Sequence, residues 1–171
     1  MRKMKSGEFS RVFALMQESF PSSEYRAEDA QRALLADEAY AVWVEEDGTG
    51  TVCAFMAVWT LEDVTFLEHF AVSPALRGAG LGGRMLDELS ERCGSVCLEA
   101  ELPQSDIARR RIGFYRRHGF TENPYPYRQP ALAPDGEPVP LVLMTLGGGI
   151  GGDEFLRIRE QLYTRVYRAR A

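Results

Sequence analysis

The most informative stretch of the sequence is Arg77-Gly78-Ala79-Gly80-Leu81-Gly82-Gly83. Before it, residues 66–72 (FLEHFAV) have the composition of a strand, which the following Ser-Pro pair ends. After it, residues 81–93 have apolar side chains at helical spacing. Glycines let backbone amides point into one concavity, and a helix N-terminus adds about half a positive charge. The stretch is therefore predicted to hold a phosphate group, with Arg77 as a full positive charge. The alternative is a tight strand-to-helix turn.

The glycine spacing also matches GxGxxG twice, at Gly78, Gly80 and Gly83 and again within residues 147–152. The first match follows an antiparallel pattern and lacks the Lys-Ser/Thr pair of a P-loop. The second is followed by one helix only, so it is predicted to be a flexible connector. The pyrophosphate of a nucleotide cofactor is the ligand favoured for the first match.

Hydrophobic periodicity predicts the remaining elements. Helices are expected at 8–19, 24–38, 81–93, 106–117 and 153–169, and strands at 39–46, 51–61, 66–72, 95–102, from 120, and at 139–146. Residues 123–138 contain five prolines and read as an irregular insertion. We expect a single domain over residues 1–171, with the C-terminal helix packed on the sheet or on a second subunit, as in a possible homodimer.

Composition limits the classes of function. The chain has 171 residues, of which 45% are hydrophobic, and its formal charge is −5. This acidic balance argues against binding to nucleic acid or to an anionic membrane. No signal-peptide pattern and no run of about 18 apolar residues is found, so a cytoplasmic protein is expected. Cys53, Cys93 and Cys97 have no CxxC spacing and are predicted to be reduced core thiols, without a metal site.

Several motifs occur in an order that is similar to that of a known family. They are FLEHFAVS, Arg77-x-x-Gly80-x-Gly82, an apolar helix, SVCLEAEL and RRRIGFYRRHGF. This order and spacing, over residues 8–122, resembles the GNAT superfamily of acetyl-coenzyme A-dependent N-acetyltransferases. The resemblance implies an α/β (α+β type) fold, a mostly antiparallel, splayed mixed sheet flanked by helices. It also implies acetyl-coenzyme A as co-substrate and a primary amine, of a small molecule or a protein, as acceptor.

The resemblance also implies which residues bind the cofactor. The strand before the turn would bind pantetheine through its backbone, and the turn would bind the pyrophosphate. The cofactor-binding residues are then Phe70, Ala71, Val72, Arg77, Gly78, Ala79, Gly80, Leu81, Gly82 and Gly83. The proline-rich insertion and the C-terminal helix lie outside the resemblance, so the acceptor is not implied by it.

Glu68 is the first candidate for the catalytic base. It lies two residues before Phe70, and alternation along a strand places both on the same face. The alternative is an exposed strand carboxylate. His69 is expected on the opposite face, as a packing residue. Glu99 and Glu101 share a face of the next strand, where they either attract a cationic amine or are solvated.

Tyr115 is the candidate acid, because a phenol of pKa about 10 can protonate a departing thiolate. Its spacing with Ala108 and Ile112 equally suits a core tyrosine, but the family's Phe-Tyr-x-x-x-Gly-Phe element favours the catalytic role. Many family members carry asparagine where this chain has Ala108, and Asp106 is either its substitute or a helix cap.

Three groups of residues remain ambiguous. The arginines at 109–111 and 116–117 are predicted to be a solvated face, with one or two reaching coenzyme A phosphates. Tyr25, Tyr125 and Tyr127 either shape an acceptor pocket or only pack. The function predicted is direct acetyl transfer to a primary amine. The alternative is a catalytically silent sensor of acyl-coenzyme A.

Overall fold

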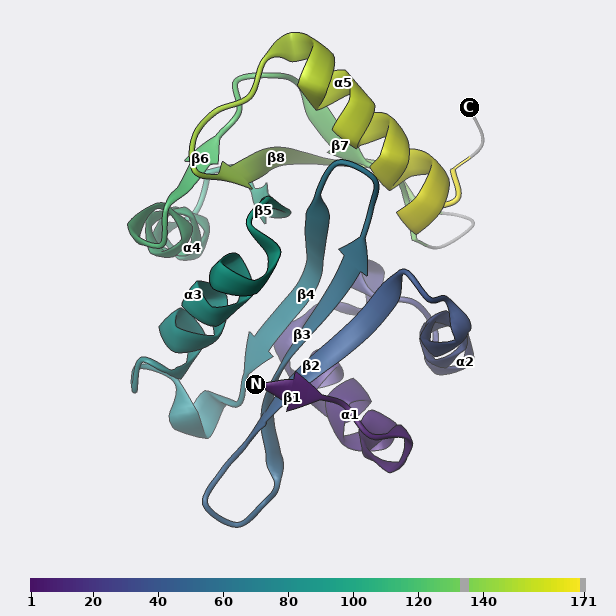
Figure 1. Ribbon diagram of the computed structural model, residues 1–171, viewed down its shortest axis with the longest axis vertical. Helices are drawn as coiled ribbons and strands as arrows, with labels where there is room; N and C mark the ends of the chain where they lie inside the picture. Colours follow the sequence, from purple (N-terminus) through teal and green to yellow (C-terminus); the bar gives the residue numbers. More distant parts are fainter. Residues whose placement is uncertain (133–135, 170–171) are drawn as a thin grey trace.

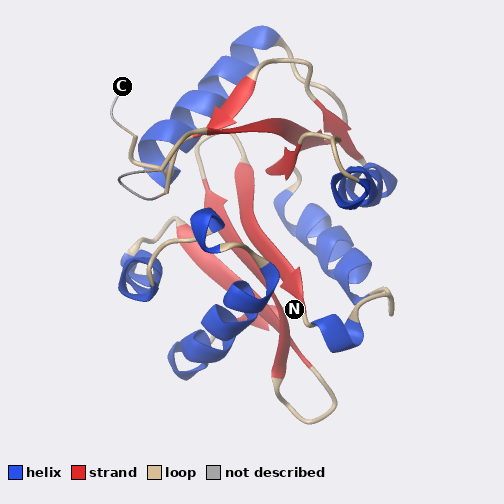
Figure 2. Ribbon diagram, turned by 180° about the vertical axis from the view of Figure 1, so that it is seen from behind, coloured by secondary structure: helices blue, strands red, loops and turns tan. Residues whose placement is uncertain are grey.

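The computed structural model describes residues 1–132 and 136–169, and it contains one eight-stranded sheet with helices on both faces (Figures 1 and 2). The strands are β1 (Arg2–Lys3), β2 (Tyr40–Glu46), β3 (Val52–Thr60), β4 (Thr65–Val72), β5 (Val96–Glu101), β6 (Phe120–Glu122), β7 (Tyr127–Gln129) and β8 (Val139–Leu146). The α-helices are α1 (Phe9–Ser19), α2 (Glu28–Ala33), α3 (Leu81–Cys93), α4 (Asp106–Arg117) and α5 (Gly152–Gln161). A π-helical turn, Leu162–Val166, continues α5.

The sheet is mostly antiparallel and opens in its middle. Its order is β1-β2-β3-β4-β5-β8-β6, with β7 also paired to β8. The parallel contact between β4 and β5 comprises three residue pairs and ends at Leu67 with Leu98. Beyond this point β5 continues alongside β8, while residues 68–72 of β4 continue alongside β3. The two halves of the sheet therefore diverge, which confirms the predicted splayed α/β fold (Figure 1).

A β-bulge interrupts β4 at the point where the sheet opens. Ala57 of β3 pairs with His69 and the next residue, Val58, pairs with Leu67, so Glu68 is an extra residue between them. An extra residue resets the alternation of side chains between the two faces. The prediction that Glu68 shares a face with Phe70, opposite His69, is therefore wrong: Glu68 and His69 lie on one face and Phe70 on the other.

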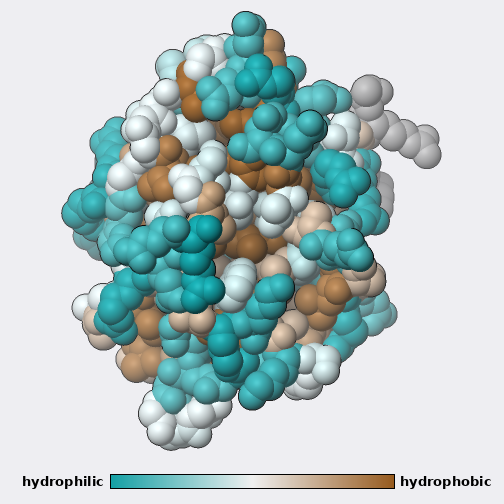
Figure 3. All heavy atoms as spheres, viewed as in Figure 1, coloured by the Kyte–Doolittle hydropathy of each residue, from teal (hydrophilic) through white to brown (hydrophobic). Residues whose placement is uncertain are grey.

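Two hydrophobic cores lie on the two faces of the sheet. One holds the apolar sides of α1, α5 and the π-helical turn against residues such as Phe55 and Trp59. The other holds α3 and α4 against residues such as Met56 and Leu67. Strand β3 contributes to both and is buried almost throughout. Hydrophobic residues also show in the middle of the face seen in Figure 3, surrounded by hydrophilic ones.

The N-terminal helical region departs from the sequence prediction. The expected helix at 24–38 is divided into a 3₁₀ turn (Ser22–Glu24), the six-residue α2 and a second 3₁₀ turn (Leu34–Ala36). Between the first turn and α2, Tyr25 packs edge-on against Phe13, and Arg26 reaches across to Glu68. These long-range contacts outweigh the local helical pattern.

Two further expectations need correction. Strand β7 lies inside the proline-rich insertion, where three residues between prolines gave no strand signal, and it is specified by pairing with β8. Cys53 and Cys97 are buried as predicted, but Cys93 is exposed because it ends the last turn of α3. No described helix has the length and apolar character needed to cross a membrane.

Candidate active site

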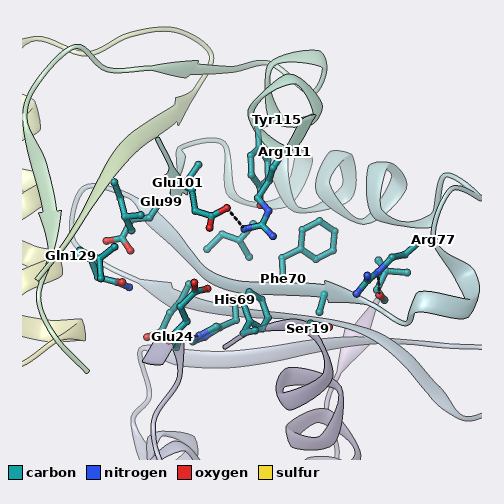
Figure 4. Close-up of a pocket in the computed structure, with 18 residues that line it drawn as sticks. Ser19, Glu24, His69, Phe70, Arg77, Glu99, Glu101, Arg111, Tyr115 and Gln129 are labelled. Carbon is teal, nitrogen blue, oxygen red and sulfur yellow. Dashed lines mark hydrogen bonds and ion pairs between the residues drawn. The ribbon is translucent and has the colours of Figure 1, made fainter. Parts of the chain in front are cut away.

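A cleft of about 380 Å³ occupies the opening between β4 and β5. Figure 4 shows Arg77 at one end of it and Glu99 with Gln129 at the other. Phe70 and Tyr115 lie between the two ends, from β4 and α4 respectively. The sheet opening therefore creates a pocket with one basic end and one acidic end, of the size typical for small-molecule sites.

The basic end is the glycine-rich turn. Gly78 and Gly80 have φ angles of +83° and +77°, which L-residues with a Cβ rarely adopt. The first helical hydrogen bond of α3 runs from Arg84 N to Gly80 O, 3.1 Å, so the amides of residues 81–83 precede it and lack a helical acceptor. The turn thus combines unpaired helical amides with the positive end of a helix, as a phosphate site requires.

Gly82 and Gly83 also allow close packing, because they lack a Cβ. A Cβ on Gly82 would lie 3.3 Å from Cζ of Phe70, and one on Gly83 would lie 2.9 Å from Cε1 of His118. These glycines therefore let α3 approach β4 and the end of α4 closely. Arg77 is exposed and donates from Nε to Val72 O, 3.0 Å, which leaves its terminal nitrogens for a ligand.

The predicted pantetheine strand lines the middle of the cleft. Phe70, Ala71 and Val72 all border it. The centroid of the Phe70 ring lies 6.4 Å from that of Phe114 on α4. Because the pairing of β4 with β5 ends at Leu67, residues 70–72 of β4 present backbone groups to the opening. Of the predicted cofactor residues, Phe70, Ala71, Val72 and Arg77 therefore line the cleft, and residues 78–83 follow Arg77 directly in the chain.

Glu68 is buried and fully engaged by other side chains. Its carboxylate accepts a hydrogen bond of 2.6 Å from Arg26 Nη1 and one of 2.9 Å from Trp59 Nε1, and its side chain is 2% exposed. Burial alone would raise the pKa of Glu68, but Arg26, His69 and these hydrogen bonds outweigh it and lower the pKa below the usual value. A buried carboxylate of low pKa is a weak proton acceptor.

His69 lies beside Glu68 instead of facing away from it. Its Nε2 is 2.7 Å from the backbone oxygen of Glu24, an arrangement in which the ring nitrogen donates. Its Nδ1 is buried and has no hydrogen-bond partner among the described residues, although Oε2 of Glu68 is 3.8 Å away. The ring also packs edge-on against Phe20, 5.2 Å between centroids, so the predicted packing role fits.

The pKa of Glu99 is shifted in the opposite direction from that of Glu68. It accepts hydrogen bonds from the hydroxyls of Tyr127 and Tyr167, the latter at 2.7 Å. Burial is the largest influence and, with the charge of Glu68, it outweighs the two hydrogen bonds and raises the pKa of Glu99 to about 7. A carboxylate that titrates near neutral pH and borders a cleft has the properties of a general base.

Two further carboxylates border the acidic end. Glu101 is 3.2 Å from Nη1 of Arg111, an ion pair that Figure 4 shows at the cleft. Partial burial raises the pKa of Glu24, Glu101 adds to this effect, and Arg111 opposes it. Four carboxylates therefore border this part of the cleft, where Arg111 is in the lining and Arg26 pairs with Glu68 from outside it, and this excess of carboxylates favours a cationic ligand.

Tyr115 lies on the other wall, in the last turn of α4. It is 9% exposed, borders the cleft and packs edge-on against Phe114 and Phe120. Burial raises its pKa, and Arg111 partly counters this. The residue therefore belongs to the core stripe and borders the cleft, and its predicted role as an acid stays a prediction.

Other predicted candidates fall outside the cleft. Ser105 caps α4 by accepting from Ala108 N, 3.1 Å, and Asp106 instead pairs with Arg109 on the surface. The arginine run is largely solvated, with Arg111 as the member that borders the cleft. Tyr25 and Tyr125 pack against phenylalanines. Within residues 1–132 and 136–169, no cluster of three or more His, Cys, Asp or Glu could hold a metal.

Comparison with known proteins shows the family. A family model of the acetyltransferase (GNAT) domain matches residues 38–122. A solved GNAT-family structure from Bacteroides thetaiotaomicron is 30% identical, with a TM-score of 0.88 over 99% of this chain and 98% of that chain. The chain belongs to the GNAT acetyltransferase family.

More distant proteins are similar in sequence or in structure. YjbC of Bacillus subtilis (strain 168), which its name assigns to the acetyltransferases, is 24% identical over 89% of this chain and 79% of its own length. The ribosomal-protein-S18-alanine N-acetyltransferase of Escherichia coli is 22% identical, with a TM-score of 0.62 over 88% of this chain and 94% of that chain. Acetyl transfer is therefore the activity of the family, with acetyl-coenzyme A as the implied co-substrate.

Sequence reasoning missed three residues of the acidic end. Arg26 and Trp59 hold Glu68, and Tyr167 holds Glu99. Arg26 and Tyr167 lie far along the chain from their partners, and Trp59 meets Glu68 only across the pairing of β3 with β4, so no local spacing marks these contacts. Tyr167 lies at an apolar-face position of the predicted C-terminal helix, and that position gives no signal of a contact with Glu99.

Proposed function

We propose that the protein transfers an acetyl group from acetyl-coenzyme A to a primary amine by direct attack in a ternary complex. The supporting observation is one cleft with Arg77, the first residue of the glycine-rich turn, at one end and four carboxylates at the other. The first end suits a pyrophosphate. The second suits an ammonium group before it loses its proton.

In this proposal the cofactor lies along β4. The amides of residues 78–83 and the guanidinium of Arg77 hold the pyrophosphate. The backbone of residues 70–72 holds pantetheine, at the strand edge left open by β5. Acetyl-coenzyme A supplies an activated thioester. The strand and the turn orient that thioester toward the acidic end.

The chain's own groups then move the protons. The amine nitrogen forms a bond to the acetyl carbon while the carbon–sulfur bond breaks. Glu99 accepts the proton that the attacking nitrogen loses, and Tyr115 donates a proton to the departing sulfur. The proton held by Glu99 then returns through solvent to the Tyr115 phenolate, which restores both groups. The raised pKa of Glu99 matches this task, because a base is most effective when its pKa is near the working pH.

Glu68, the base expected from the sequence, is the competing assignment. Its carboxylate is engaged by Arg26 and Trp59 and its pKa is lowered, which supports a role in holding Arg26 at the acidic end. The arrangement around Glu99 supports the proton-accepting role better. Both assignments leave the overall reaction unchanged.

The proposal is tested by calorimetry with acetyl-coenzyme A, followed by release of free thiol in the presence of a panel of amines. The panel contains monoamines, diamines, amino acids and a peptide with a free amino terminus. Binding followed by amine-dependent thiol release supports the proposal. Tight binding without turnover on any amine favours an acyl-coenzyme A sensor instead, and absence of binding contradicts both.

A further inference from the structure

We propose that Tyr127 and Tyr167 are positioning residues that hold Glu99 at the acceptor end of the cleft and tune its affinity for a proton. The inference rests on the proposed function, in which Glu99 accepts the amine proton. Both tyrosines lie outside residues 38–122, the part of the chain that the family model matches. The C-terminal helix and the proline-rich insertion would then be parts of the active site.

The direction of the hydrogen bonds is fixed by chemistry. Gln129 Nε2 is 2.9 Å from the Tyr167 oxygen, and an amide nitrogen can only donate. The single hydroxyl proton of Tyr167 therefore points to Oε2 of Glu99, 2.7 Å away. Tyr127 is 3% exposed and its hydroxyl contacts Oε1 of the same carboxylate. Each oxygen of Glu99 thus accepts one phenolic hydrogen bond.

The backbone around Tyr167 is irregular in a way that serves this contact. The π-helical turn Leu162–Val166 precedes it, and Tyr167 N bonds to Leu162 O, 3.0 Å, five residues back. A π-turn inserts one residue into a helix and is often found at functional sites. Arg168 follows with φ of +51°, a strained conformation for a residue with a Cβ. The C-terminal helix therefore departs from regular geometry at the point where the Tyr167 side chain contacts Glu99.

The titratable groups that face Glu99 come from every element packed against it. They are Glu68 on β4, Cys97 on its own strand, Tyr127 on β7, and Tyr163 and Tyr167 at the C-terminal helix. Two of these donate hydrogen bonds to the carboxylate and favour its charged form. Removal of either hydroxyl should therefore raise the proton affinity of Glu99.

The test uses Tyr127→Phe, Tyr167→Phe and the double variant of the full chain. The control is Tyr163→Phe, because the Tyr163 hydroxyl donates to the backbone oxygen of Arg128 and not to Glu99. The carboxyl carbon of Glu99 is followed by ¹³C NMR as pH is varied, and its signal is assigned by its absence from Glu99→Gln. This readout does not depend on turnover, so it remains valid if no amine is acetylated.

We expect the midpoint of Glu99 to rise by about one pH unit in each single variant, and further in the double variant. The acidic limb of kcat/KM should move by the same amount, with a loss of roughly fivefold at pH 7. Tyr163→Phe should leave both unchanged. Unchanged midpoints in both single variants, or an equal shift in the control, would overturn the inference.

A second modification guards against a variant that does not fold. Replacement of Tyr167 by 3-fluorotyrosine keeps the ring and hydroxyl but makes the phenol a stronger donor. The Glu99 midpoint should then fall instead of rising. A fall supports the hydrogen bond as the cause, and a midpoint that stays unchanged argues against it. Absence of amine-dependent thiol release in the unmodified protein would contradict the proposed function, while the midpoints would still decide the inference.

Discussion

Arg26 Nη1 lies 2.6 Å from Oε1 of Glu68, and the two side chains are only 12% and 2% exposed. Arg26 also donates from Nη2 to the backbone oxygen of Val166, 2.9 Å away. This one guanidinium therefore connects the N-terminal region, the bulge in β4 and the C-terminal helix. The acidic end of the cleft is assembled from three distant parts of the chain.

Glu68→Gln should lower the free energy of unfolding by about 3 kcal/mol, because breaking a buried pair leaves an uncompensated charge. The measurement is urea unfolding followed by circular dichroism. The matched control is Glu28→Gln, which breaks the exposed pair with Arg32 and should cost less than about 0.5 kcal/mol. Equal, small losses in both variants would show that the buried pair does not stabilise the fold.

Substitution of the two candidate bases should affect kcat to different extents. Glu99→Gln should reduce kcat by about 10²- to 10⁴-fold, the usual range for loss of a general base, while acetyl-coenzyme A affinity stays unchanged. Glu68→Gln should reduce kcat of the folded protein by less than about tenfold. Initial rates of thiol release measure both. The reverse order of losses would return the proton-accepting role to Glu68.

Stability should depend on pH through Glu99. Its pKa is raised from 4.5 to about 7, so between these values the folded state binds more protons than the unfolded state. The contribution to stability is then present at low pH and is lost as pH rises toward 7. Relative to Glu99→Gln, the protein should lose about 2–3 kcal/mol of unfolding free energy between pH 5 and pH 8. A difference that is independent of pH would contradict the raised pKa.

Gly80→Asp should strongly weaken acetyl-coenzyme A binding, because it places a carboxylate at the helix N-terminus that we propose holds the pyrophosphate. Gly50→Asp is the matched control: Gly50 has φ of +81°, close to the +77° of Gly80, and lies in the β2–β3 turn. Both variants carry a similar conformational strain of about 1 kcal/mol. Calorimetry should show lost affinity for the first only, and equal affinities would place the phosphate site elsewhere.

Local signals in the sequence predicted the strand, the turn and the helix of the proposed cofactor end. The turn at Gly80, its strand and its helix are neighbours in the chain, so spacing alone places them together. The bulge at Glu68 escaped prediction because an extra residue is visible only when β4 is paired with β3. Tyr167 escaped because it lies 68 residues from Glu99 and depends on a π-helical turn.

The central claim is that the acetyl group passes directly to an amine. It is tested most directly by incubating the protein with acetyl-coenzyme A that carries an isotopic label in the acetyl group. The acceptor is an amine that supports release of thiol from acetyl-coenzyme A in the panel assay. Mass spectrometry then follows the label on the acceptor and on the protein. We predict one labelled acetyl group on the amine nitrogen for each thiol released, and none on the protein under single-turnover conditions. Label that accumulates on a protein side chain before it reaches the amine, or thiol release without an acetylated amine, would contradict this account.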